Sequence, residues 1–186
     1  MALLGFRTCR CSLYLVAFLL GAAILPAAAQ PLAASEYELK AAFLFNFAKF
    51  VEWPSEAFSG PSQPITICVL GKNPFGSALN EVIAGNTLHG RPFSTRLIAD
   101  IRENEDCHIL FFPASESKST RPLLEQVRNP CALTVGEAGN FLPGGGMVNF
   151  VIQDGRVRFE INPAAVGKSN LRVSSKLLSL ATNSRK

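Results

Sequence analysis

The most pronounced apolar pattern in the chain runs through residues 35–54 and predicts one helix. Apolar side chains recur there at helical spacing, namely Leu39, Phe43, Phe47 and Phe50. Alanine, leucine and phenylalanine residues between them widen the apolar surface to most of the circumference, so the helix is either buried in protein or spans a membrane. A span needs about 20 predominantly apolar residues, and polar residues interrupt this shorter run. We therefore expect a long N-terminal helix buried in the core.

Both ends of this helix carry sequence signals. Ser35 and Glu38 have the spacing of a capping box, which satisfies free amides at a helix start. Pro54 disfavours helical geometry at the residue before it. The helix is therefore predicted to end at Trp53.

Short apolar runs alternate with helical segments in the middle of the chain. The runs that predict strands are residues 65–70, 91–98, 108–112 and 132–136. The segments that predict helices are residues 74–83 and 119–127. Strands that alternate with helices pair in parallel, and both faces of such a sheet are covered. The pattern predicts an α/β fold with a mostly parallel sheet and helices on both faces.

The C-terminal part of the chain predicts a different connection. Residues 147–153 and 156–161 both alternate apolar with polar positions, and Asp154-Gly155 lies between them. This dipeptide supplies the positive φ angles of a tight type I′ turn. We expect an antiparallel β-hairpin on one edge of the sheet, followed by a final helix at residues 171–180.

Residues 1–29 have the three parts of a secretory signal peptide. Arg7 and Arg10 supply a positive start, an apolar stretch follows, and residues 27–29 are small alanines before a cut ahead of Gln30. The alternative is an uncleaved membrane anchor. The alanine-rich end of the segment favours cleavage over this alternative. Cleavage would leave a single domain, residues 30–186, in an oxidising compartment outside the cytoplasm.

The charge of the chain argues against nucleic acid or an anionic membrane as a partner. Two of the 18 basic residues lie in the signal segment, so 16 basic residues face 14 acidic ones in the remainder. This excess is small and the basic residues are scattered, whereas an electrostatic binding surface needs a basic patch.

Residues 71–77 follow a predicted strand and open a helix, which is the position of a phosphate-binding loop. Such a loop needs a lysine directly after its last glycine, but here Ser77 follows Gly76. An ordinary strand-to-helix turn is the better interpretation.

Other candidate chemistry is equally incomplete. Ser115, a histidine and Asp100 or Asp106 offer the residue types of a hydrolytic triad, but no serine lies in a Gly-x-Ser-x-Gly elbow. Asp106, Cys107 and His108 offer metal-ligand types, but neighbouring residues of a strand point to opposite faces. We therefore predict no catalytic residue, no metal and no cofactor.

Three cysteines remain after residue 29, namely Cys68, Cys107 and Cys131. In a doubly wound sheet of flavodoxin-like order, the strands that hold or follow Cys68 and Cys107 are neighbours, so a disulfide is possible. Two buried reduced thiols are the alternative. An oxidising compartment favours the disulfide and leaves Cys131 as a free thiol.

Residues 139–146 form an unusual glycine-rich stretch before the hairpin. Glycines permit left-handed backbone or close approach of another chain segment. The stretch is either a mobile recognition loop or a tight turn that leads into the hairpin.

Several of these segments together resemble one family. In order along the chain they are residues 40–54, 65–71, 107–115, 134–137, the glycine-rich turn with 147–150, 158–162 and 171–178. Their order and spacing are similar to those of the YfiR-like proteins, a family of bacterial periplasmic proteins.

The resemblance implies a periplasmic α/β protein without enzymatic activity. It implies a regulator that binds the periplasmic sensor domain of an inner-membrane diguanylate cyclase and represses the enzyme, so that release raises cyclic di-GMP and promotes biofilm formation. It also implies a homodimer that responds to envelope redox state. The alternative is a periplasmic small-ligand receptor that reports to a histidine kinase or another membrane sensor.

Cys68 and Cys107 match the positions of a disulfide of this family. A second family disulfide would fall near Leu142 and Asn149, and neither position is a cysteine here. This departure argues against a redox switch that needs two disulfides.

The recognition edge is expected where the parallel strands end, because loops at the carboxyl ends of such strands form binding crevices. The residues that we expect to contact a partner there are Asn73, Phe75, Ser115 and Ser117. Phe75 is expected to be exposed.

Overall fold

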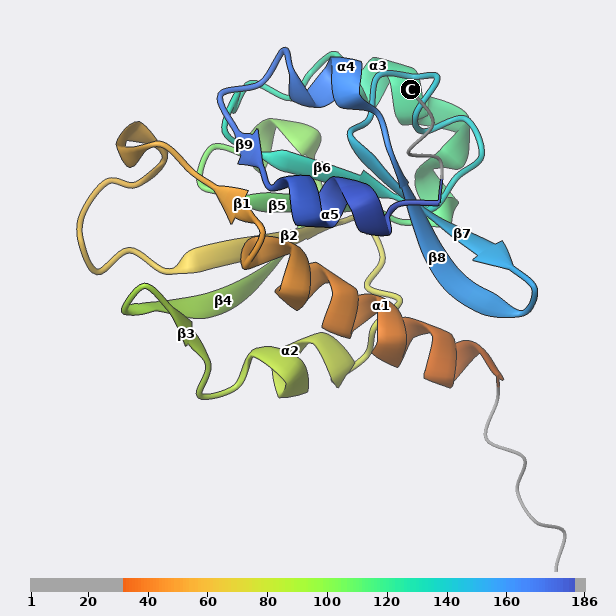
Figure 1. Cartoon of the computed structure of the whole chain (residues 1–186), viewed down its shortest axis with the longest axis horizontal. Coiled ribbons are helices and arrows are strands. Elements are labelled where there is room, and N and C mark those ends of the chain that lie inside the picture. The colour runs from red at the N-terminus through yellow and green to blue at the C-terminus, as the bar shows by residue number, and fades with distance from the viewer. Residues whose placement is uncertain (1–31, 183–186) are drawn as a thin grey trace, which may run out of the picture. The chain divides into compact units, whose positions relative to one another are not determined.

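A computed structural model describes residues 32–182 of the chain (Figure 1). The predicted signal peptide lies outside the described residues. The α-helices are α1 (Leu32–Ala48), α2 (Ala78–Ile83), α3 (Thr120–Leu124), α4 (Pro163–Val166) and α5 (Ser175–Leu180). Single 3-10 turns are η2 (Ser55–Ala57), η3 (Ile101–Glu103) and η4 (Ala114–Ser119). The strands are β1 (Val51–Glu52), β2 (Ile65–Leu70), β3 (Thr87–Leu88), β4 (Arg91–Ile98), β5 (Ile109–Phe112), β6 (Leu133–Gly136), β7 (Val148–Gln153), β8 (Arg156–Ile161) and β9 (Arg172–Val173).

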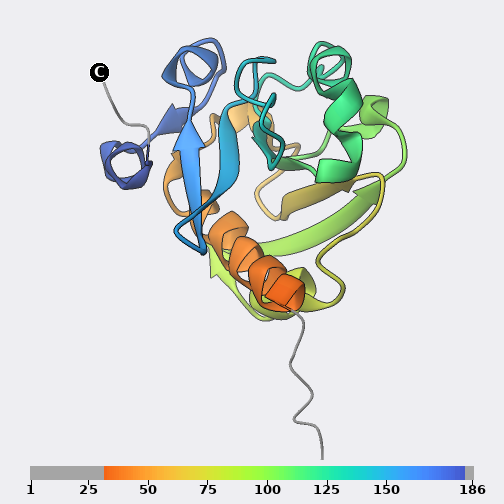
Figure 2. The same ribbon diagram turned by 90° about the vertical axis from the view of Figure 1, so that its right-hand side faces the viewer.

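Seven strands form the main sheet in the order β3-β4-β2-β5-β6-β7-β8. The five strands from β4 to β7 are parallel, and β3 and β8 are antiparallel additions at the two edges. The parallel part has the flavodoxin-like order, which places β2 beside β5. The mixed α/β class with a mostly parallel sheet is therefore confirmed. Figure 2 shows the sheet curling around α1.

The sheet separates two apolar cores. On one face, side chains such as Ile67, Val69 and Phe111 pack with α1, α2 and α5. On the other face, Leu110, Phe112 and their neighbours pack with η3 and with the segment around α3. The two sets alternate along β2 and β5, as side chains of a strand must.

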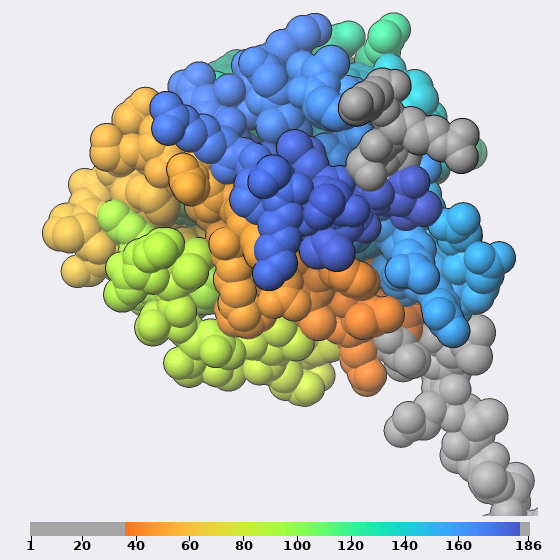
Figure 3. All heavy atoms as spheres, in the orientation of Figure 1, coloured from red at the N-terminus to blue at the C-terminus, as the bar shows by residue number. Residues whose placement is uncertain are grey.

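Helix α1 lies on the first of these faces and supplies much of its aromatic packing. The ring of Phe47 lies 5.7 Å from that of Phe150 and 5.0 Å from that of Phe159. Phe43 lies 6.0 Å and 5.7 Å from the same two rings. In the space-filling view, blue atoms of the C-terminal segment adjoin the orange atoms of α1 (Figure 3).

Three details of the predicted helix are wrong. Ser35 lies inside α1, so the helix does not begin with a capping box at that residue. Leu39 is 46% exposed, although it belongs to the apolar stripe that is expected to be buried. The helix ends at Ala48 and not at Trp53, because Val51 and Glu52 pair with β9 and the Ser174 amide donates to the carbonyl of Phe50.

The C-terminal segments form an antiparallel hairpin of β7 and β8, in which Phe150 pairs with Phe159. Asp154 and Gly155 have φ values of 51° and 68°, as a type I′ turn requires. The segment 171–180 is not one helix: β9 comes first, and α5 then begins after Ser174, whose hydroxyl accepts a hydrogen bond from the Leu177 amide. Within residues 32–182, no helix combines the length and apolarity needed to cross a bilayer.

Candidate functional site

A buried ionic cluster lies where β5 and β6 end, and we call Glu36, Tyr37, Lys40 and Glu137 the Lys40 cluster. Glu137 follows β6 directly, so the strand fixes its position. The ammonium nitrogen of Lys40 lies 2.6 Å from Oε2 of Glu137 and 2.5 Å from Oε1 of Glu36. Helix α1 presents its three members together because residues three and four positions apart share a helix face.

The other oxygen of Glu137 joins three segments. Its Oε1 accepts hydrogen bonds from the Tyr37 hydroxyl at 3.0 Å and from the Ala114 amide at 2.7 Å. Ala114 begins η4, directly beyond β5. Glu137 therefore fastens α1 to the carboxyl ends of two neighbouring strands.

Burial makes these contacts important for stability. The side chains of Lys40 and Glu137 are only 5% and 4% exposed, whereas that of Glu36 is 33% exposed. A buried charge is tolerated only when it is paired and hydrogen-bonded. Burial and the charge of Glu137 raise the pKa of Tyr37 far above its ordinary value, so its phenol keeps the proton that it donates to Glu137.

A cavity of about 320 Å³ opens beside the Lys40 cluster. Besides the cluster, it is lined by residues of β7 and of the segments that follow β5 and β6, namely Ala114, Gly139, Asn149, Phe150, Val151 and Ile152. Two glutamates and one lysine give this site an excess of one negative charge. Such a site favours groups that donate hydrogen bonds or carry positive charge.

The predicted partner residues surround this edge, but one of them is not on the surface. Phe75 is 4% exposed, so the expectation that it is exposed is wrong. Its ring packs between those of Tyr37 at 5.5 Å and Phe111 at 4.8 Å. An aromatic residue in a strand-to-helix loop can turn into the core, and here α1 supplies the surface that it covers.

The polar partner residues have different environments. Asn73 is exposed, but its side chain accepts from the Phe75 amide and donates to the Gly76 carbonyl, so it shapes the loop. Ser115 is exposed on η4. Ser117 is half-buried, and its carbonyl accepts hydrogen bonds from Thr120 and Asn140. Their role in contacting a partner stays a prediction.

A disulfide joins Cys68 in β2 to Cys107 just before β5, with the two Cα atoms 5.7 Å apart. Both residues are fully buried in the core opposite α1. Cys131 is a free, buried thiol whose pKa is raised by burial. At the positions of the second family disulfide, Leu142 is half-buried and Asn149 is buried.

The glycine-rich stretch is a tight turn packed around one ring. Phe141 is fully buried, and its ring lies directly against the backbones of Gly136 and Gly146, where a Cβ atom would collide with it. The structure therefore favours the turn over the mobile recognition loop.

His108 does not contribute to a hydrolytic site. It is 2% exposed, its Nδ1 accepts from the Thr66 amide at 3.1 Å, and its ring stacks on Phe58 at 4.6 Å. Burial lowers the pKa of this imidazole. Within residues 32–182, histidine, cysteine, aspartate and glutamate side chains form no group suited to hold a metal ion.

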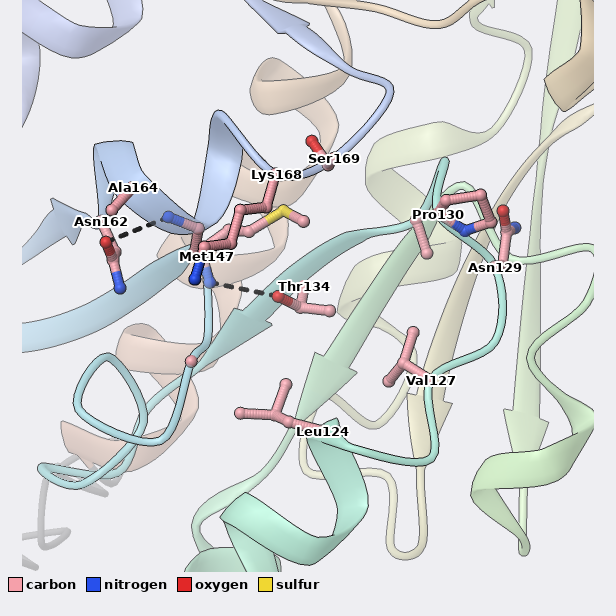
Figure 4. Close-up of a pocket in the computed structure, with 13 residues that line it drawn as sticks. Leu124, Val127, Asn129, Pro130, Thr134, Met147, Asn162, Ala164, Lys168 and Ser169 are labelled. Atoms are coloured by element: carbon pink, nitrogen blue, oxygen red, sulfur yellow. Dashed lines mark hydrogen bonds between the residues drawn. The ribbon is translucent and has the colours of Figure 1, made fainter.

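Another cavity, of about 380 Å³, lies between the segment after α3 and the residues of α4 (Figure 4). Its polar groups mostly bind the protein's own backbone. The Thr134 hydroxyl accepts from the Met147 amide at 3.1 Å, and Oδ1 of Asn162 accepts from the Ala165 amide at 3.2 Å. Only Lys168 contributes a charge, so this cavity offers less recognition chemistry than the one beside the Lys40 cluster.

Fold and site together define an α/β domain of flavodoxin-like strand order, fastened by one disulfide and by a buried ionic cluster. The chain belongs to the YfiR/HmsC-like family: the family model DUF4154 matches residues 37–182. Proteins of this family are periplasmic regulators of cyclic di-GMP signalling rather than enzymes.

A solved structure, that of a conserved domain protein from Vibrio cholerae O1 biovar El Tor strain N16961, has a similar fold. The TM-score is 0.53 and the sequence identity 10%, over 78% of this chain and 59% of that chain. At this identity the likeness concerns the fold alone. A comparison with curated proteins gives no match.

Sequence reasoning missed the Lys40 cluster. One signal was available, because Lys40 interrupts an otherwise apolar helix and Glu137 directly follows a buried strand. Nothing in the pattern pairs these two residues, since they are 97 positions apart.

Proposed function

We propose that this protein is a periplasmic repressor that binds the periplasmic sensor domain of an inner-membrane diguanylate cyclase and holds the enzyme inactive. The observation that carries the proposal is the match of the YfiR/HmsC-like family model to residues 37–182. Release of the repressor would raise cyclic di-GMP and promote biofilm formation.

The location in the periplasm rests on two further features. Residues 1–29 have the composition of a cleavable signal peptide. The buried Cys68–Cys107 disulfide suits an oxidising compartment, because disulfides are rare where thiols are kept reduced.

Repression sets a thermodynamic condition on binding. A ligand shifts a conformational equilibrium only through its different affinities for the two states. Moving a cyclase from 99% active to 99% inactive needs a preference of about 10⁴-fold for the inactive conformation. The repressor must therefore contact a part of the sensor domain that changes shape.

The recognition surface that we propose is the edge at the carboxyl ends of β2, β5 and β6. Ser115 is exposed there beside the Lys40 cluster, and Asn73 lies in the neighbouring loop. We further propose that the protein acts as a homodimer, whose mass in solution light scattering would measure.

The test is co-purification of the tagged protein with membrane proteins from envelope extract, with and without reductant. Ser115→Arg places a long charged side chain on the proposed surface and is expected to reduce recovery of the cyclase by about tenfold or more. Ser62→Arg is the matched control: Ser62 is also exposed but precedes β2, so it lies at the opposite ends of the parallel strands. Recovery of no membrane signalling protein in either condition would contradict the proposal.

A further inference from the structure

The outer half of β7 extends past the strand that borders it. β6 pairs with β7 at only two positions, the last being Gly136 opposite Asn149. β8 pairs with β7 on the other side as far as Gln153. Residues 150–153 therefore continue beyond the end of β6. Phe150 is buried, but within residues 32–182 no strand lies beside residues 151–153 on that side. Such an edge offers N–H and C=O groups to another chain.

The hydrogen bonds of the hairpin show which groups of β7 face this open side. The Asn162 amide donates to the Met147 carbonyl at 2.8 Å. Met147 and Asn162 are therefore a hydrogen-bonded pair. Along an antiparallel ladder such pairs alternate with pairs that are not hydrogen-bonded, so the odd-numbered residues of β7 bond to β8 and the backbone N–H and C=O of Ile152 point away from β8. The same alternation holds on β8. The carbonyl of Phe159 points away from β7, because it accepts a hydrogen bond from the Thr182 amide.

Apolar surface lies beside this edge. Ile152 is 55% exposed and Leu39 is 46% exposed, two of the four large apolar side chains that are strongly exposed within residues 36–182. Phe43 of α1 contacts Phe150. Leu39 lies one helical turn before Phe43, and Ile152 lies two residues after Phe150 on the same face, so both extend this apolar contact outward.

The charge of the adjoining cavity selects among possible occupants. Ile152, Glu36 and Glu137 line the same cavity of about 320 Å³. Lys40 is already paired with both glutamates, so the site retains one excess negative charge, and the partly exposed side chain of Glu36 makes it accessible. An acidic segment would meet two carboxylates, whereas a lysine or arginine would be attracted.

We propose that the edge of β7 at residues 151–153 accepts an extended segment of a partner protein as an added strand, with a basic side chain of that segment beside Glu36. Strand addition obtains affinity from main-chain hydrogen bonds and specificity from alternate side chains. This proposal rests on the proposed function only for the identity of the partner, because the edge and its charge are properties of this chain alone.

The experiment measures hydrogen exchange of single amides by NMR on the protein purified from the periplasm. The probe is the peptide acetyl-TVKVKVT-amide. One control peptide has alternate residues N-methylated, and another has glutamate in place of each lysine. We expect the peptide to slow exchange at the Ile152 amide by about tenfold or more, and to leave Arg158 unchanged, because β8 already pairs with β7 there. Both control peptides are expected to have no such effect.

Two variants distinguish a loss of peptide binding at the β7 edge from a loss caused by unfolding. Ile152→Pro removes an N–H that points away from β8, and is expected to abolish peptide binding while β7 and β8 stay paired. Should this variant not fold, Glu36→Gln serves instead and is expected to weaken binding of the lysine peptide about threefold or more. Exchange at Ile152 that is already slow in the free protein, self-association through this edge, or equal binding of the control peptides would each overturn the proposal. The test uses no cyclase, so its failure leaves the proposed repressor function standing.

Discussion

The Cys68–Cys107 disulfide makes a quantitative prediction about stability. The two residues are 39 positions apart along the chain. In the loop-closure model, a cross-link of this length removes about 13 cal/mol/K of entropy from the unfolded chain, which corresponds to about 4 kcal/mol at 25 °C. We therefore expect reduction to lower the free energy of unfolding by up to this amount.

The cleanest comparison is between oxidised and reduced protein of the same sequence, because packing of the two buried sulfurs then changes least. A Cys131→Ala background removes the free thiol and prevents exchange among the three cysteines of residues 30–186. With a urea slope of about 2 kcal/mol/M, the expected loss shifts the unfolding midpoint by about 2 M. Circular dichroism against urea concentration measures the midpoint, and the same titration of Cys131→Ala against the unaltered protein is the control.

Two outcomes would refute this reasoning. An unchanged midpoint after verified reduction would mean that the cross-link does not restrict the unfolded chain. A loss of all secondary structure on reduction without urea would mean that the apolar cores contribute far less than their extent implies.

Four further predictions concern single residues. Lys40→Met leaves Glu137 buried without its cation and should lower the free energy of urea unfolding by about 3–5 kcal/mol. Lys49→Met is the control: this lysine is exposed over the Phe45 ring, and its loss should lower the same free energy by about 0.5 kcal/mol. Equal losses would contradict the role of the Lys40 cluster. Gly146→Ala drives a methyl group into the buried Phe141 ring and should cost about 1–3 kcal/mol, whereas Gly139→Ala has open space and should change stability by less than about 0.5 kcal/mol. Phe75→Ala should cost about 3–5 kcal/mol, because the ring is buried between two others; a loss of partner binding at full stability would instead mean that it is a surface contact. Burial lowers the pKa of His108 in the folded protein, so the unfolded chain binds more protons below the ordinary imidazole pKa of 6.5, and stability should fall as pH falls below that value. His108→Gln should reduce this pH dependence, and an equal dependence in both proteins would count against burial of a neutral imidazole.

The fold class could be predicted because its determinants are local. Buried strands such as β2 and β5 are runs of branched and aromatic residues, and the Asp154-Gly155 turn requires positive φ angles that few dipeptides supply. The alternation of these strands with helices then leaves few topologies.

The errors lie where distant segments decide a local outcome. The helix ends early because Val51 and Glu52 pair with a strand more than a hundred residues later, and no local signal shows this. Phe75 is buried because α1 places Tyr37 against it. The Lys40 cluster depends in the same way on β6 delivering Glu137 to a particular turn of α1.

We propose above that this protein represses a diguanylate cyclase from the periplasm. The most direct measurement is cellular cyclic di-GMP, quantified by mass spectrometry in a strain that lacks the protein and in the same strain complemented with it. We expect cyclic di-GMP to rise in the deletion strain, to return to the parental level with the intact protein, and to stay high with a form that lacks residues 1–29 and remains in the cytoplasm. An unchanged or lower level of cyclic di-GMP in the deletion strain would contradict repression.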